Sequence, residues 1–268
     1  MRTHGLRFDV NCSILFTELP LLRRPAAAKA AGFDAVEFWW PFEDPVPGDH
    51  EVDAFIRSLD DAGVALAMLN FAAGDLAAGD RGLLSSRSGS PRFQDNLDVC
   101  AGIAQRTGCH ALNALYGNRA ADTDPRLAIT NITIAAQVAR PIGATVLIEA
   151  LNTYDCPDYP LTSSESVIAL LDAIRPHNVA FLADLYHLAR MGEDLPATLA
   201  AYSGRIGHIQ IADVPGRGAP GTGALDYQSV FDQLADRGYD GWIGLEHTPA
   251  DPADSSTSFA WLTGHGVR

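Results

Sequence analysis

The stretch Thr145-Val146-Leu147-Ile148-Glu149 decides the fold of this 268-residue sequence. It is a short apolar run that ends in a carboxylate, and Ala180-Phe181-Leu182-Ala183-Asp184 repeats the pattern further along the chain. Runs that are apolar at nearly every position are typical of parallel strands buried on both faces. A segment with helical periodicity lies between the two runs, so the sequence indicates a βαβ unit with a right-handed crossover.

Units of the same kind extend over the whole chain. Several of their helical segments are followed by a glycine that suits a helix C-terminus, such as Gly63 and Gly108. Eight units predict an α/β fold, a single (β/α)8 TIM barrel with a parallel eight-stranded core that forms one domain over residues 1–268, whereas six would suggest an open doubly wound sheet. The expected strands are 8–13, 35–38, 65–70, 111–115, 145–149, 180–184, 206–211 and 242–246. The expected helices are 20–31, 52–62, 91–107, 125–142, 163–174, 195–202 and 227–237.

Composition excludes several classes of partner. The formal net charge is −14, which repels the phosphate backbone, so no nucleic acid is expected as a partner. The chain has no run of about 18 apolar residues and its first residues lack the apolar segment of a signal peptide, so we expect no membrane span and no secretion. The cysteines show no CxxC pairing and are expected to be reduced and mostly buried, which favours the cytoplasm: Cys12, Cys100, Cys109 and Cys156.

Polar side chains end or interrupt the last four expected strands. The active site of a parallel barrel lies at the carboxyl ends of its strands, so these side chains should converge. Three carboxylates and an amide oxygen form an all-oxygen set, which suits Mg²⁺ or Mn²⁺ better than zinc. A charged group at the end of an apolar strand is otherwise costly unless it is paired. The predicted metal ligands are Glu149, Asp184, Gln210 and Glu246.

Three further residues are candidates for substrate binding. His187 follows Asp184 by three residues, Arg217 lies in the loop after the seventh strand, and Asn70 ends the third strand. Glu37 on the second strand is a weaker candidate for the same role. Strand alternation is taken to turn His208 and His247 away from the site. The irregular segments 41–50, 75–90 and 152–162 are expected to form loops on the catalytic face.

Several short motifs spread over almost the whole chain carry a family resemblance: FTELP at 16–20, AGFDAVEF at 31–38, LNF at 69–71, VLIEALN at 146–152, DLYH at 184–187, HIQIAD at 208–213, PGR at 215–217 and GWIGLE at 241–246. The chain resembles hydroxypyruvate isomerases, within the wider xylose-isomerase-like barrel superfamily. The resemblance implies that Glu149 and Glu246 act as the acid/base pair as well as holding the metal. Related ketose 3-epimerases use the positions matching His187 and Arg217 to hold substrate oxygens. One departure is His247-Thr248-Pro249, where the family usually has Tyr-Lys-Pro or Tyr-Arg-Pro.

The resulting hypothesis is a metal-dependent isomerase of a small hydroxy-oxo acid that works through an enediolate, such as hydroxypyruvate to tartronate semialdehyde. A ketose 3-epimerase or another sugar isomerase on the same barrel is the alternative within enzymes. An endonuclease-IV-like phosphodiesterase would need a histidine-rich site and a basic groove, which the charge disfavours. A non-catalytic sugar-binding barrel is the alternative from another class. The partner is therefore a small hydroxy-oxo acid or ketose, and a homo-oligomer is compatible with this function.

Overall fold

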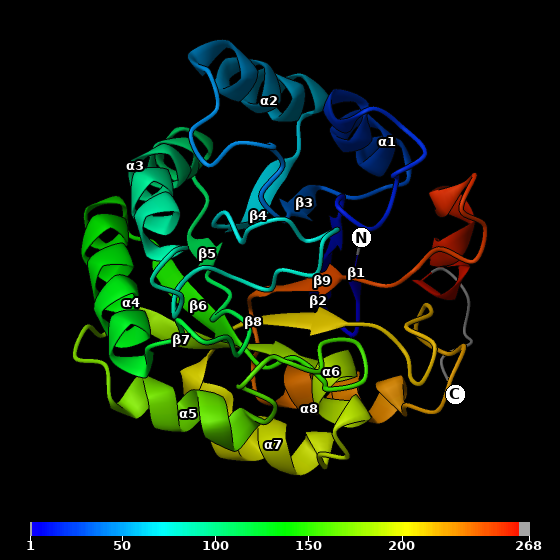
Figure 1. The fold of residues 1–268 in the computed structure, drawn as a ribbon. Coiled ribbons are helices and arrows are strands. Elements are labelled where there is room, and N and C mark those ends of the chain that lie inside the picture. The colour runs from blue at the N-terminus through cyan, green and yellow to red at the C-terminus, as the bar shows by residue number, and fades with distance from the viewer. Residues whose placement is uncertain (1, 263–268) are drawn as a thin grey trace.

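Residues 2–262 are described by the computed structural model, and across them eight strands form a closed parallel barrel (Figure 1). The last strand, β9 (Trp242–Leu245), pairs in parallel with β2 (Leu6–Asn11), which closes the sheet. A two-residue strand, β1 (Arg2–Thr3), pairs antiparallel with β2. This confirms the predicted TIM barrel. The other strands follow in chain order: β3 (Ala35–Phe38), β4 (Ala65–Asn70), β5 (Ala111–Asn113), β6 (Thr145–Glu149), β7 (Val179–Asp184) and β8 (Ile206–Ile211).

Helices form the outer ring around these strands (Figure 1). Their ends follow local rules: Asp124 accepts a hydrogen bond from the Arg126 amide at the start of α4, and Gly63 ends α2 in the left-handed region, at φ 63°. The α-helices are α1 (Arg24–Ala30), α2 (Asp49–Ala62), α3 (Ser90–Thr107), α4 (Pro125–Ala139), α5 (Ser164–Asp172), α6 (Leu185–Arg190), α7 (Leu195–Tyr202) and α8 (Tyr227–Asp236). Short 3₁₀ helices are η1 (Leu21–Arg23), η2 (Arg140–Ile142), η3 (Ser203–Arg205) and η4 (Ser255–Leu262).

The expected strands 35–38, 65–70, 145–149 and 206–211 match the structure at both ends. Others shift by a few residues: β2 covers 6–11 where 8–13 was expected, and β5 stops at 113. Helix α6 was not expected, because its six residues are too few to show periodicity. The expected helix 20–31 divides into η1 and α1. The four cysteines are free and buried, as predicted.

The strands separate two apolar regions. Outward-facing residues such as Val146 and Ile148 pack in the main core against the helices. A separate small cluster consists of Met68, Leu147 and Leu182, which alternation places inside the barrel. Polar residues occupy the rest of the interior, so the barrel has an apolar half and a polar half inside. Buried polar residues on the inner faces of β2, β3 and β8 include Asp9, Glu37, His208 and Gln210.

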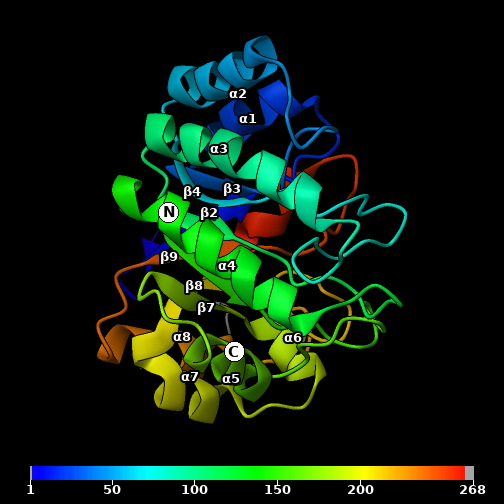
Figure 2. The ribbon, with the colours of Figure 1, turned by 60° about the vertical axis from the view of Figure 1, so that its left-hand side comes forward.

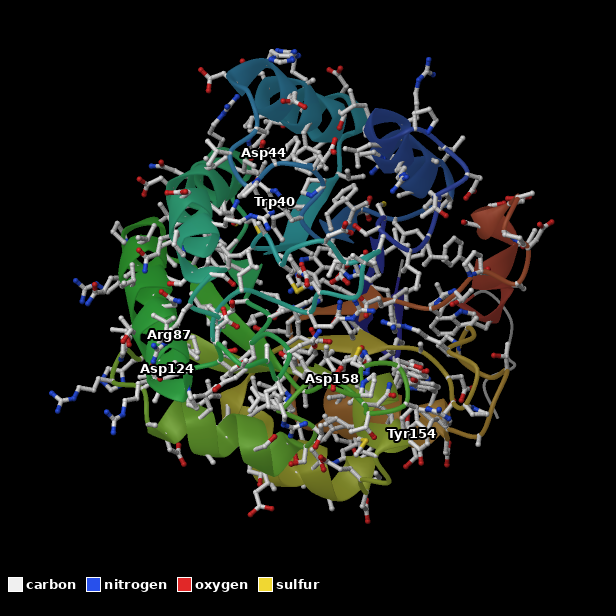
Figure 3. The ribbon with its side chains drawn as sticks, viewed as in Figure 1. Trp40, Asp44, Arg87, Asp124, Tyr154 and Asp158 are labelled. Carbon is white, nitrogen blue, oxygen red and sulfur yellow. The ribbon has the colours of Figure 1, made fainter. Side chains whose placement is uncertain are left out.

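The catalytic end of the barrel carries the longest connections. Figure 2 shows the loops that follow β4 and β5 projecting from the end where α6 lies. An exposed ion pair joins these two loops, with Arg87 Nη2 3.1 Å from Asp124 Oδ2 (Figure 3). Among residues 2–262, no helix combines the length and the apolar character needed to cross a bilayer.

Candidate active site

A cavity of about 140 Å³ lies at the carboxyl ends of the strands. Side chains from five strand ends and from the loops 75–90 and 152–162 form its walls, which is where a TIM barrel places its active site. Of the residues predicted from the sequence, Asp184 and Gln210 are not among those that line the cavity in the described part of the chain. The lining residues are Trp39, Asn70, Leu76, Arg81, Leu115, Glu149, Leu151, Cys156, His187, Arg217 and Glu246.

Three buried carboxylates, those of Glu149, Asp184 and Glu246, lie at this site and are each at most 5% exposed. Burial raises the pKa of Glu149 well above its usual range, and the charges of Glu246 and Asp184 raise it further. Burial and the Glu246 charge likewise raise the pKa of Asp184. Burial also raises the pKa of Glu246, although Arg217 opposes that shift. When ionised, these three carboxylates and Arg217 together carry a charge of −2, so a divalent cation bound among them would relieve their repulsion.

Glu246 and Glu149 are held very differently. Glu246 Oε2 accepts a hydrogen bond from Arg217 Nη2 at 2.6 Å, and Oε1 accepts from Trp39 Nε1 at 2.6 Å and from Asn11 Nδ2 at 2.8 Å. Glu149 Oε2 accepts one hydrogen bond, from Asn113 Nδ2 at 2.9 Å. Its Oε1 accepts none from the described residues. Glu246 is therefore fixed by three donors, whereas one oxygen of Glu149 is left for another ligand.

Gln210 supplies the fourth predicted metal ligand, and its surroundings test whether a metal fits. Its Nε2 donates to Glu37 Oε1 at 2.7 Å, while its Oε1 is buried and has no hydrogen-bond partner in the described residues. A buried carbonyl oxygen without a partner costs about 1–3 kcal/mol. Gln210 lies in register with Asp184, and its unused amide oxygen together with three carboxylates that repel one another is a donor set that fits Mg²⁺ or Mn²⁺.

His187 reaches the cavity because helix α6 begins directly at the end of β7. Asp184 Oδ1 accepts hydrogen bonds from the Tyr186 and His187 amides, at 2.8 and 3.2 Å, and so caps the helix. Burial, followed by the Arg217 charge, lowers the pKa of His187 well below its usual range, so the ring is neutral. Its Nδ1 accepts from the Asn152 amide at 3.0 Å, which leaves the proton on Nε2. Donor atoms of Glu149, Asp184 and His187 lie within 4.8 Å of one another, but a protonated Nε2 suits a substrate oxygen better than a metal.

Arg217 is held in place by the loop that follows β8. Asp213 accepts hydrogen bonds from the backbone amides of residues 214, 221, 223 and 225, which folds this loop back on itself. Arg217 has a left-handed backbone, at φ 56°, and its guanidinium lies 5.1 Å from the centre of the Tyr186 ring. Burial lowers the pKa of Arg217, but the Glu246, Asp184 and Glu149 charges together raise it, so the side chain stays charged.

Asn70 and Arg81 line the cavity on another side. Asn70 is 3% exposed and its Oδ1 has no partner in the described residues. The guanidinium of Arg81 is held by Cys156 Sγ at 3.2 Å and by two backbone carbonyls, and its Nη2 makes no hydrogen bond within residues 2–262. The next residue is Gly82, at φ 112°, where a Cβ atom would lie 2.0 Å from the Leu115 carbonyl oxygen. Glycine at this position therefore lets the loop approach β5 and brings Arg81 to the cavity.

Sequence reasoning missed four residues that shape the site: Asn11, Trp39, Arg81 and Asn113. Asn11 and Asn113 end β2 and β5, but the expected strands 8–13 and 111–115 ran two residues past them, so the strand-end rule that identified Glu149 and Asp184 did not identify them. Trp39 directly follows β3 and offered the same signal. Arg81 lies in a loop without periodicity, and the sequence gives no indication of where it points.

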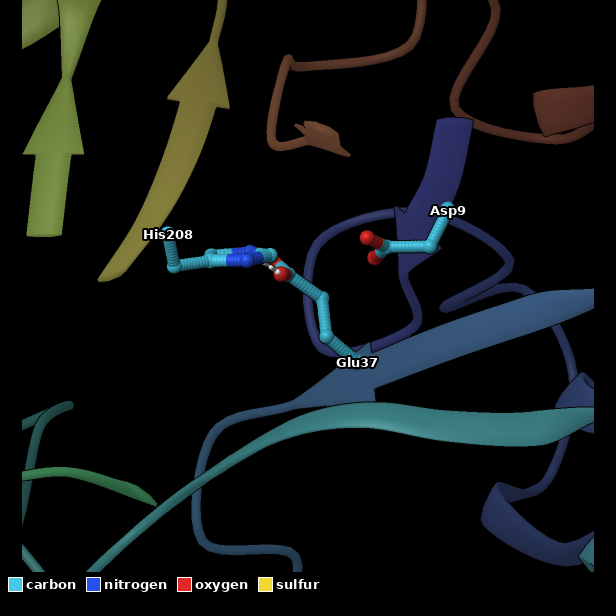
Figure 4. Close-up of side chains that lie close together, drawn as sticks. All are labelled: Asp9, Glu37 and His208. Atoms are coloured by element: carbon cyan, nitrogen blue, oxygen red, sulfur yellow. Dashed lines mark hydrogen bonds and ion pairs between the residues drawn. The ribbon is translucent and has the colours of Figure 1, made fainter. Parts of the chain in front are cut away.

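The expectation that both neighbouring histidines face away from the site is wrong for His208. It lies two positions before Gln210 on β8, so the two share the inner face, and both contact Glu37. Figure 4 shows the contact between His208 and Glu37. His247 follows Glu246 by one residue and does face outward, packing against the Phe259 ring at 6.0 Å. Glu37, the weaker candidate for substrate binding, is fully buried and does not line the cavity.

Comparisons with known proteins agree with this geometry. Residues 25–265 match the family described as xylose isomerase-like TIM barrel. A Streptomyces coelicolor protein provisionally named hydroxypyruvate isomerase is 54% identical over 266 residues, which is 96% of this chain and 95% of that protein. The 2-oxo-tetronate isomerase of Cupriavidus necator is 35% identical over 260 residues, covering 96% and 97%. A Brucella melitensis crystal structure described as a family 2 AP endonuclease has a TM-score of 0.88 at 33% identity, covering 97% and 99%.

The chain belongs to the xylose isomerase-like TIM-barrel family. Within that family it is similar to proteins named hydroxypyruvate isomerase and 2-oxo-tetronate isomerase, which confirms the resemblance seen in the sequence motifs.

Proposed function

We propose that this chain is a metal-dependent isomerase of a three- or four-carbon hydroxy-oxo acid, with hydroxypyruvate as the first candidate. The observation that carries the proposal is the placement of Glu149 and Glu246 on one small cavity. The buried, unpaired amide oxygen of Gln210 adds to it, since Gln210 lies in register with Asp184 on the neighbouring strand. The names of the relatives support the same class, since both hydroxypyruvate and 2-oxo-tetronate are small hydroxy-oxo acids.

Glu149, Asp184, Gln210 and Glu246 would hold the metal, with Mg²⁺ or Mn²⁺ as the ions that the all-oxygen set favours. When bound, the ion polarises a carbonyl and makes the neighbouring C–H more acidic. His187 is neutral with its proton on Nε2, so it donates to a substrate oxygen and helps orient the substrate.

The two glutamates differ in a way that suits an acid/base pair. Arg217 stabilises the charged form of Glu246, which suits the group that takes a proton from the hydroxymethyl carbon. Glu149 has an oxygen without a partner and a pKa raised by burial and repulsion, which suits the group that returns a proton to the neighbouring carbon. One further proton passes from the hydroxyl oxygen to the carbonyl oxygen, so substrate and product contain the same atoms. In the reverse direction the two roles exchange.

The size and charge of the cavity support a small acid as the substrate. Its volume of about 140 Å³ is well below the roughly 300–1,000 Å³ of sites for drug-sized ligands, which favours three or four carbons over a six-carbon ketose. The basic residue that the family usually carries after the last glutamate is replaced here by Thr248. Arg217 is already paired with Glu246, and Arg81 is then the cation best placed to receive a carboxylate.

Proton exchange in D₂O tests the proposal. The full chain would be incubated with Mg²⁺ or Mn²⁺ and, separately, with hydroxypyruvate, 2-oxo-tetronate and a hexulose, and followed by NMR. We expect deuterium at the hydroxymethyl carbon of hydroxypyruvate and conversion to tartronate semialdehyde, both lost with EDTA. Exchange at C3 of the hexulose alone would show a ketose 3-epimerase. If the chain binds metal but catalyses proton exchange in none of these compounds, it would be a binding protein and not an isomerase.

A further inference from the structure

Glu37 is a buried hydrogen-bond acceptor that touches several elements of the site without reaching the cavity. It is fully buried, and its Oε1 accepts from Gln210 Nε2 at 2.7 Å and from Asn11 Nδ2 at 2.9 Å. His208 Nε2 lies 2.7 Å from its Oε2 (Figure 4). Three strands, β2, β3 and β8, therefore meet at one carboxylate.

This carboxylate fixes which way the Gln210 amide points. An ionised carboxylate accepts hydrogen bonds and donates none, so the NH₂ group of Gln210 must face Glu37. The carbonyl oxygen is then turned away from Glu37, and it is the atom found buried without a partner. An amide turned the other way would set two oxygens against each other and withdraw the only ligand atom that Gln210 can offer.

Glu37 also acts on a second candidate ligand through Asn11. Asn11 Nδ2 donates to Glu37 Oε1 at 2.9 Å and to Glu246 Oε1 at 2.8 Å, so one amide joins the two carboxylates. The fold makes room for this arrangement at Gly244, where a Cβ atom would lie 2.4 Å from Glu37 Oε2. Any other residue at position 244 would push the Glu37 carboxylate from its place.

The close approach of Asp9, Glu37 and His208 can be explained without a second metal ion bound among them. Donor atoms of the three lie within 4.8 Å of one another (Figure 4). Both Glu37 oxygens already accept hydrogen bonds, so a cation there would have to displace His208. Burial, together with the Glu37 charge, raises the pKa of Asp9 well above its usual range, which favours a neutral Asp9 beside the charged Glu37.

We propose that Glu37 is a positioning residue that orients Gln210, and through Asn11 also Glu246, for binding of the divalent metal. The inference rests on the proposed function, because it takes these residues as metal ligands. Partners of metal ligands typically contribute about 10–100-fold to metal affinity, which sets the size of the expected effect.

Binding of Mn²⁺ alone to the full chain, measured by EPR and calorimetry, tests this role without relying on turnover. Glu37→Gln leaves one acceptor oxygen in place of two and sets an NH₂ group against part of this set of donors, so it should weaken Mn²⁺ binding about 10–100-fold. Gln210→Glu keeps a ligating oxygen but sets two carboxylates against each other, and should weaken binding similarly. The double variant Glu37→Gln/Gln210→Glu restores a donor–acceptor pair and should recover most of the affinity. Asp9→Asn is the matched control, because it changes a neighbouring buried acid that contacts no candidate ligand; its affinity should stay within about threefold of the original.

Three results would each overturn the role of Glu37. The first is an unchanged Mn²⁺ affinity in Glu37→Gln, and the second is an equal loss of affinity in Asp9→Asn. The third is a double variant that binds Mn²⁺ no better than the single variants. If Glu37→Gln does not fold, as judged by circular dichroism, the Mn²⁺ affinity of Gln210→Glu tests the role of Glu37 by itself. An added carboxylate ligand should strengthen binding if Glu37 plays no part, and weaken it if Glu37 requires a donor at position 210. Turnover is measured separately: a chain that binds Mn²⁺ without isomerising hydroxypyruvate would overturn the proposed reaction and leave the Glu37 result standing.

Discussion

Replacement of Arg81 by glutamine tests whether this chain recognises an acid. The guanidinium is held at the cavity wall by Cys156 Sγ and by two backbone carbonyls, and Nη2 makes no hydrogen bond among the described residues. A hydrogen bond to a charged group contributes about 1.5–3 kcal/mol. Because Arg81 is only half-buried, solvent screening places the expected loss in the lower part of that range, which corresponds to a KM for hydroxypyruvate raised about 10- to 30-fold.

The assay compares hydroxypyruvate with dihydroxyacetone, a neutral analogue in which a hydroxymethyl group replaces the carboxylate. Proton exchange with D₂O reports on both compounds. Arg81→Gln should raise KM for the acid and leave the KM for exchange of the neutral compound nearly unchanged. Arg87→Gln is the matched control, since Arg87 lies in the same loop but is 72% exposed and pairs with Asp124. An equal change for both compounds, or no change for either, would refute the assignment of Arg81 to the carboxylate.

Three other outcomes follow from the site. Glu149→Gln and Glu246→Gln should each lower kcat by about 10²–10⁴-fold or more with metal still bound. Of the two, only Glu149→Gln should still exchange deuterium slowly into hydroxypyruvate in D₂O. Near-normal turnover in either variant would remove the replaced glutamate from the mechanism. Arg217→Ala removes the cation that stabilises the charged form of Glu246, so it should lower kcat for hydroxypyruvate by at least about tenfold; an unchanged kcat would contradict this role of Arg217. Burial lowers the pKa of His247 to about 4, so this ring is neutral in the folded chain and takes up a proton on unfolding below its ordinary pKa of about 6.5. The free energy of unfolding should therefore fall by about 3 kcal/mol between pH 6.5 and 4 because of this residue. Urea unfolding of His247→Leu should lack that part of the pH dependence, and parallel curves for the two chains would contradict it.

The fold could be predicted from the sequence because its signals are local. Apolar runs such as 145–149 are too short for helices and too continuous for half-exposed strands, and glycines such as Gly63 end the intervening helices. Helix α6 was not predicted because its start depends on the N-terminal cap that the Asp184 side chain provides, and a helix of six residues shows no other signal. The 3₁₀ helix η4 has no clear apolar face, so its sequence carries no periodic pattern.

The candidate site could be predicted where chemistry coincides with a strand end, or, for His187 and Arg217, where a polar residue closely follows one. Glu149 and Glu246 satisfied that rule, and both line the cavity. Arg81 did not, because its position depends on the approach of Gly82 to the Leu115 carbonyl, a contact between distant parts of the chain. The role of Glu37 could not be predicted from the sequence either, because it depends on contacts between three strands that meet only once the barrel closes.

The divided interior of the barrel has a consequence for how this protein tolerates change. Met68, Leu147 and Leu182 fill one half by apolar packing, while the hydrogen-bonded groups around Glu37 fill the other. Volume-conserving exchanges in the apolar half usually cost less than about 1.5 kcal/mol. Its residues nevertheless lie in register with polar ones: Met68 with Glu37, Leu147 with Asn113, and Leu182 with both Glu149 and His208. Stability and chemistry therefore draw on different residues that lie next to one another in the sheet. New substrates can evolve at one rim of the barrel while compensating mutations accumulate in Leu147 and its apolar neighbours.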